Sequence, residues 1–103
     1  MEKKMPAVCR GDTRDLDIFH CSLPFRLGRS SDVKVNGTGI SRQGDFNTPH
    51  LRPRFGFCPP HAAPIATGSI SVKVNGKGCG RVGDIVRGCT SVATGSSNVF
   101  AGG

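Results

Sequence analysis

The sequence predicts a small all-β domain with little or no helix, on three observations. The pentapeptide VKVNG occurs at residues 33–37 and returns 39 positions later, at residues 72–76. Within it, apolar and polar residues alternate with the two-residue period of a half-buried strand. No stretch of useful length shows the ~3.6-residue apolar period of an amphipathic helix.

Further similarities extend this repeat into three units. Each unit is expected to contain a Gly-Asp turn, a variable insert, a small-residue turn, a short strand and a closing turn. The Gly-Asp turns follow an arginine, at residues 10–12, 42–45 and 81–84. The expected strands are residues 32–35, 71–74 and 98–101. We therefore predict one domain over residues 1–103, with a mobile basic leader at 1–8 and units at about 9–40, 41–79 and 80–103.

The first two strands are expected to open hairpins. Asn36-Gly37 and Asn75-Gly76 are strong signals for a type I′ turn, because both central residues of that turn have positive φ. The return strands are expected to carry residues 40–42 and 79–81. The aspartates of the Gly-Asp turns are interpreted as turn formers that bind backbone amides, rather than as a carboxylate cluster. They are Asp12, Asp45 and Asp84.

Length and composition allow only a thin core. The chain has 103 residues, 36% of them apolar, with fifteen glycines and no Trp or Tyr. A domain of this size buries little apolar surface, so we expect a metal, a disulfide or a partner to stabilise it. Five cysteines are an odd number for a closed disulfide set, and together with three histidines they favour reduced thiols and a metal.

The charge is strongly basic, at +7. An anionic partner such as nucleic acid would fit this charge. The basic residues are scattered, however, and a solubilising surface explains them better. No apolar run approaches the ~20 residues of a membrane helix, and the N-terminus has no apolar segment typical of a cleaved signal peptide.

Nearly all the reactive side chains lie in the inserts, which three similar units would bring together at one end. Four His or Cys ligands suit a structural zinc site. One contribution or more from each unit favours His20, His50, His61 and Cys89. Cys58 is the reserve, since Cys58 and His61 have the C-x2-H spacing of a metal knuckle, whereas Cys21 would point away from the side of His20 in an extended segment.

The two other cysteines, Cys9 and Cys79, fall within the repeated frame. We expect them to be small buried apolar residues, with a disulfide between them as the open alternative. The chain has no G-x-S-x-G, H-E-x-x-H or Gly-rich phosphate loop, so we expect no enzymatic activity.

The repeated frame, G-S-x-x-V-x-V-N-G followed by a Gly-Asp turn, resembles that of PAAR-repeat proteins, the tips of contractile injection machines. The resemblance covers about residues 6–103 and is most specific in GDFNTPH…CPPHAAPIATGSISVKVNG of the second unit. The segment that is usually Pro-Ala-Ala-Arg in the family is GISR at 39–42 and GCGR at 78–81, where only the arginine is kept.

This resemblance implies a compact cone of short β-hairpins with pseudo-threefold repeats and a Zn²⁺ near the apex, with Fe²⁺ as the less favoured metal. Carried over by motif, the ligands are His20 of unit one, His50 and His61 of unit two, and Cys89 of unit three. The base of the cone would sit on a trimeric β-helical spike, VgrG-like in type VI secretion or the hub spike of a phage baseplate, with one tip per trimer.

The implied role is structural: the tip caps the blunt end of the spike and sharpens it for piercing a target envelope, with only transient membrane contact. No further domain is seen in the sequence, so any effector is expected on a separate chain. The protein would reside at a phage tail tip, or be assembled in the cytoplasm and expelled by a secretion machine.

Two alternatives belong to other classes. A small basic zinc module that binds nucleic acid would use the net charge, the Cys58–His61 knuckle and the basic pair Arg52 and Arg54. It predicts salt-sensitive binding to DNA or RNA. A metallohydrolase would need an open coordination position and a general base, and four protein ligands would exclude it.

Overall fold

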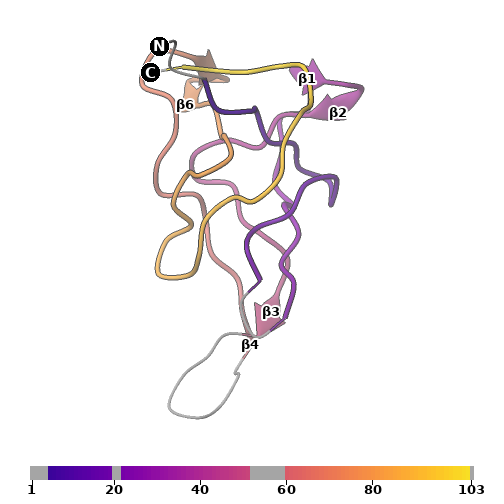
Figure 1. Cartoon of the computed structure of the whole chain (residues 1–103), viewed down its shortest axis with the longest axis vertical. Coiled ribbons are helices and arrows are strands. Elements are labelled where there is room, and N and C mark those ends of the chain that lie inside the picture. The colour runs from indigo at the N-terminus through magenta and orange to yellow at the C-terminus, as the bar shows by residue number, and fades with distance from the viewer. Residues whose placement is uncertain (1–4, 20–21, 52–59, 103) are drawn as a thin grey trace.

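Short antiparallel strand pairs make up all the regular structure that the computed structural model describes, in residues 5–19, 22–51 and 60–102. The pairs are β1 (Lys34–Val35) with β2 (Thr38–Gly39), β3 (His50–Leu51) with β4 (Pro60–His61), and β5 (Lys73–Val74) with β6 (Lys77–Gly78). These residues include no helix, and so none that could cross a membrane. The all-β prediction is confirmed. The described part tapers from an end that holds β1, β2 and β6 to an end at β3 and β4 (Figure 1).

The hairpins β1–β2 and β5–β6 turn at the two Asn-Gly pairs. Asn36 and Gly37 have φ of 54° and 80°, and Asn75 and Gly76 have φ of 53° and 77°. Both central residues are therefore left-handed, as the predicted type I′ turn requires. A Cβ added at either glycine would meet no atom within 4 Å, so backbone conformation rather than space favours glycine here.

The return strands are shorter than predicted, because the chain leaves each hairpin to pair with the start of the same unit. Residues 40–42 and 79–81 were expected to continue β2 and β6. Ile40 still donates its amide to Val33 O at 3.0 Å, but its bridge partner is Arg10, and Arg42 forms a bridge with Cys79. The chain crosses toward the middle of the molecule at this point, so hairpin pairing ends and contacts with the start of the same unit begin.

Three such segments meet in a closed ring of backbone hydrogen bonds. The amide of Ser41 donates to Cys9 O at 3.1 Å, that of Cys9 to Gly80 O at 3.0 Å, and that of Gly80 to Ser41 O at 3.0 Å. A Cβ on Gly80 would lie 2.5 Å from Ser41 O and 2.8 Å from Cys9 Sγ. The ring therefore marks a crowded pseudo-threefold axis to which each unit contributes one residue.

In unit three, the N-terminal segment takes the place of the return strand that β2 and β6 supply in the other two units. The amide of Val8 donates to Val99 O, as Ile40 donates to Val33 O and Cys79 to Val72 O in the other two units. Ala7 bridges Phe100, and the amide of Ala101 donates to Pro6 O at 3.1 Å. Residues 6–8 are thus the return strand for residues 99–101, and the prediction that they belong to a mobile leader is wrong.

Serine side chains connect the three units around the axis. Ser30, Ser69 and Ser96 each accept a hydrogen bond from the backbone amide three residues on, at 2.9, 2.8 and 3.0 Å. Each hydroxyl also donates to an oxygen of another unit, and the acceptors are Asn75 Oδ1, Gly102 O and Asn36 Oδ1 in that order. The contacts run from unit one to two, two to three and three to one, so the ring is closed.

Arginine–aspartate pairs stabilise the turns that follow the axis. The Arg42 backbone amide and Nε both donate to Asp45 Oδ2 at 2.8 Å, and Arg81 contacts Asp84 in the same way. The turn-forming interpretation is confirmed for these two aspartates.

In unit one the carboxylate is Asp15, whose Oδ2 lies 2.7 Å from the Arg10 amide. The prediction of Asp12 for this role is wrong. Asp12 and Thr13 take left-handed φ of 55° and 62°, which lengthens this turn and leaves Asp12 exposed. The next carboxylate along the chain, Asp15, therefore reaches back to Arg10.

Apolar side chains form two buried clusters. The first draws equivalent positions from all three units: Val8, Ile40 and Cys79, with Val35, Val74 and Ala101. The second comprises Cys9, Ala63, Ile65, Val86 and Val92.

The prediction that the two frame cysteines are buried is confirmed. Cys9 and Cys79 are 0% and 1% exposed, and both are free thiols. Burial raises the pKa of both, that of Cys79 to about 11. The frame cysteines therefore act as apolar core residues, and the disulfide alternative is not adopted.

Candidate metal centre

Two histidines face each other at the narrow end of the molecule, on β3 and β4 (Figure 1). His50 and His61 are direct cross-strand partners in this antiparallel pair. Side chains of directly opposed residues share one face of a sheet, with Cβ atoms about 4.5–5.5 Å apart. The two imidazole centroids accordingly lie 4.3 Å apart, with the rings inclined at 61°.

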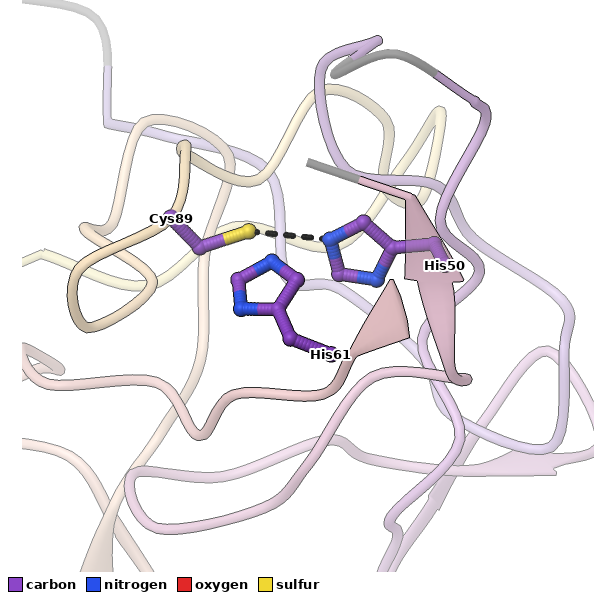
Figure 2. A group of neighbouring side chains, drawn as sticks. All are labelled: His50, His61 and Cys89. Atoms are coloured by element: carbon purple, nitrogen blue, oxygen red, sulfur yellow. Dashed lines mark hydrogen bonds between the residues drawn. The ribbon is translucent and has the colours of Figure 1, made fainter. Parts of the chain in front are cut away.

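Cys89 reaches the same point from the third unit. Its backbone amide donates to Val86 O at 3.0 Å, and Gly88 takes a left-handed φ of 59° in the turn between them. The turn directs the thiol at the histidine pair, and Cys89 Sγ lies 3.1 Å from His50 Nε2 (Figure 2). One ligand atom from each of His50, His61 and Cys89 lies within 4.8 Å of the others. Residues of two units therefore form a group that can hold a metal ion.

The tautomer of His50 is set by the backbone just before β3. His50 Nδ1 lies 2.8 Å from Thr48 O, and because a carbonyl oxygen only accepts, Nδ1 carries the hydrogen. The Nε2 lone pair is then directed at Cys89, and the thiol donates to it. Metal-bound histidines usually have their second nitrogen held in this way by a carbonyl or carboxylate. His50 is thus preset to bind a metal through Nε2.

The donor chemistry fits a tetrahedral transition metal. Neutral imidazole and thiolate are ligands that Zn²⁺ accepts readily, and a structural site takes four of them. A metal bound here would have two nitrogen donors and one sulfur donor from the described residues. His50 is buried, and His61 and Cys89 are half-buried, so the group is shielded on one side by the protein.

Of the four predicted ligands, three are brought together. His50, His61 and Cys89 form the group, while His20 lies outside the described residues. The other two candidates, Cys21 and Cys58, lie outside the described residues as well. The identity of a fourth ligand therefore stays a prediction.

A buried polar network adjoins the sulfur, and it was not predicted from the sequence. Asn47 Nδ2 lies 4.0 Å from Cys89 Sγ and 2.9 Å from Asp17 Oδ2. Asp17 in turn pairs with Arg26 Nη1 at 3.0 Å, and both side chains are fully buried. Burial raises the pKa of Asp17, and the Arg26 guanidinium opposes that shift. The one available signal was the alternation of Asp15 and Asp17 with apolar residues, which places both carboxylates on one face of an extended segment.

Neither a comparison with protein-family models nor a search of curated proteins returns a match for this chain.

Proposed function

We propose that this protein is the tip of a contractile injection apparatus, a PAAR-like cap on the blunt end of a trimeric β-helical spike. The observation that carries the proposal is the closed ring of three units about one axis. A single chain with such a ring can offer similar contacts to each of three identical subunits of a threefold partner. The spike would be VgrG-like or the hub of a phage baseplate.

The wide end has the surface that such docking needs. Apolar side chains are exposed beside the hairpins at this end, among them Ile70 at 79% and Phe100 at 47%. Val33 and Val72, which precede β1 and β5, are partly exposed at equivalent positions of two units. Grouped exposed apolar residues are typical of protein–protein contacts. Covering this face with the end of the spike would remove them from water.

At the narrow end, a metal would crosslink two units. Zn²⁺ bound by His50, His61 and Cys89, with His20 as the predicted fourth ligand, would tie the β3–β4 pair to the turn of unit three. Zn²⁺ is preferred over Fe²⁺ because thiolate and imidazole form a set that suits it. Because metal binding contributes directly to folding free energy, the apex would resist unravelling under load.

The nucleic-acid alternative gains no support from the described residues. Four arginines pair with carboxylates, which makes them less available for phosphate contacts: Arg10, Arg26, Arg42 and Arg81. Arg52 and Arg54 lie outside the described residues.

The test is co-expression with a trimeric spike protein of a contractile injection apparatus. We expect a complex of one chain per trimer, measured by native mass spectrometry. Ile70→Asp and Phe100→Asp, placed at the wide end, should abolish the complex, whereas Ile85→Asp, at another exposed apolar position, should leave it intact. Failure to bind any such trimer, together with salt-sensitive binding to DNA, would refute the proposal in favour of the nucleic-acid module.

A further inference from the structure

A buried polar chain runs from the candidate metal centre into the molecule. It begins at Cys89 Sγ, passes through Asn47 and Asp17, and ends at Arg26. Asn47 is 1% exposed, and both Asp17 and Arg26 are 0% exposed. Three fully buried polar side chains linked by hydrogen bonds are unusual in a domain with so small a core.

The amide of Asn47 has only one orientation that satisfies its neighbours. The backbone N–H of Ala63 can only donate, so the atom 2.9 Å from it is Oδ1. The carboxylate of Asp17 can only accept, so the atom 2.9 Å from its Oδ2 is Nδ2. One amide hydrogen is used on Asp17, and the other is then directed toward Cys89 Sγ at 4.0 Å. The neighbours therefore determine which Asn47 atom faces the sulfur.

The Asp17–Arg26 pair holds this arrangement rather than adding much stability. Arg26 donates through Nη2 to Asp45 O at 2.6 Å and through Nε to Ser41 Oγ at 3.3 Å, which fixes the guanidinium near the axis. Asp17 Oδ1 accepts no hydrogen bond from the part of the chain that the structure describes. A buried ion pair is often no more stabilising than apolar residues of similar volume, because both charges lose their water. What this pair supplies is a fixed carboxylate against which Asn47 is oriented.

We propose that Asn47 is a positioning residue of the metal centre, whose N–H directs the Cys89 sulfur toward His50 and His61. The inference rests on the metal binding in the proposed function. An amide hydrogen bond to a metal-bound thiolate fixes the direction of the sulfur and withdraws electron density from it. Partners of this kind commonly change metal affinity about 10–100-fold when they are removed. Asn47 would thus couple the apex to the body of the fold.

The test measures Zn²⁺ affinity by chelator competition and the thiolate-to-metal charge-transfer band of the Co²⁺ form. Asn47→Leu keeps the branched shape of the side chain and removes the amide. We expect it to weaken Zn²⁺ binding about tenfold or more and to shift the Co²⁺ band. Asn47→Ser, which retains a polar group too short to reach the sulfur, gives the same result if the leucine variant does not fold. The control is Asp84→Asn, which alters a buried Arg–Asp pair without contacting the site, and it should change neither readout.

The outcomes separate the two proposals. Wild-type affinity and an unshifted band in a folded Asn47→Leu or Asn47→Ser variant would overturn the role of Asn47 and leave the metal centre standing. A wild-type protein that binds neither Zn²⁺ nor Co²⁺ would refute the metal centre itself, and the positioning role with it. Equal losses in the Asn47 variants and in Asp84→Asn would also overturn the inference, since general destabilisation would then explain both.

Discussion

Individual residues at the candidate metal centre are oriented by backbone groups that can only donate or only accept a hydrogen bond. Thr48 O can only accept, so His50 carries its hydrogen on Nδ1 and offers Nε2. Ala63 N can only donate, so Asn47 presents its Nδ2 to the carboxylate and the sulfur. The geometry of the group is therefore set before a metal arrives, which lowers the cost of ordering its ligands on binding.

Replacing Cys89 should remove the metal without unfolding the protein. We expect Cys89→Ser to reduce bound Zn²⁺ to well below one equivalent, because the sulfur donor is lost from a group of three described ligands. Cys79→Ala is the matched control: it removes a buried thiol outside the group, costs about 1–2 kcal/mol of folding free energy and keeps the metal. The measurement is elemental analysis of purified, dialysed protein. Unchanged zinc in Cys89→Ser would show that the group is not the site.

The buried thiols also make the folded state less stable at alkaline pH. The pKa of Cys79 is raised to about 11, so the folded state keeps a proton that the unfolded chain loses near pH 9. Between these values the unfolded state binds fewer protons, and the free energy of unfolding therefore falls as pH rises. We expect the urea midpoint to drop between pH 9 and 11, and the drop to be smaller in Cys79→Ala. An identical pH dependence in the two proteins would contradict this.

At the residue level, the sequence allows ligands to be predicted, but not their supports. His and Cys are identified by type, and three of the four predicted ligands come together. Asn47 and Asp17 have no such signature, since an Asn or Asp in a loop is ordinarily a turn former. Their role arises only from neighbours that are distant in the chain, 42 positions in the case of Asn47 and Cys89.

Among the elements, the turns were predictable and the strand lengths were not. An Asn-Gly pair fixes its own hairpin turn through local backbone preference, and both turns have the predicted conformation. The strands end early because Ile40 and Arg42 form bridges with residues distant in the chain, which no local pattern encodes. The misassigned Asp12 has a similar cause, since a longer turn moved the carboxylate from Asp12 to Asp15.

Alanine substitutions at two glycines compare the cost of backbone strain in a hairpin turn with the cost of crowding at the axial ring. Gly76→Ala places a side chain at φ of 77° in open space, and should cost about 1–2 kcal/mol of backbone strain. Gly80→Ala places a Cβ 2.5 Å from Ser41 O at the axial ring, and should cost about 3 kcal/mol or more because three segments must shift. Chemical denaturation monitored by circular dichroism measures both. A Gly80→Ala variant as stable as Gly76→Ala would show that the ring is not tightly constrained.

For the whole molecule, the two ends of the described chain close the fold. Residues 6–8 pair with residues 99–101, so the start of the chain supplies the strand partner of unit three. The internal repeat predicted three units but not this closure, because the N-terminal residues carry too little of the repeated frame to be recognised as a return strand. The equivalence of residues 6–8 to the other return strands appears only in the hydrogen bonds: the Val8 amide donates to Val99 O as the Ile40 amide donates to Val33 O.

The pairing of residues 6–8 with residues 99–101 can be tested by a deletion, which removes it, and by a circular permutation, which keeps it. The two changes should have opposite effects on folding. Deletion of residues 1–8 removes Val8 from the first apolar cluster and leaves the strand at 99–101 without its partner, so we expect a loss of several kcal/mol and a largely unfolded chain. A circular permutant keeps the contact: a short Gly/Ser linker joins the two ends, near which the Ala101 amide donates to Pro6 O, and the chain is opened after Gly76, at the end of an exposed turn. We expect it to fold and to bind Zn²⁺ as the natural order does, measured by thermal unfolding and zinc content. Because closure through residues 6–8 makes the ring independent of where the chain begins, a stable deletion variant or an unfolded permutant would each contradict the closure.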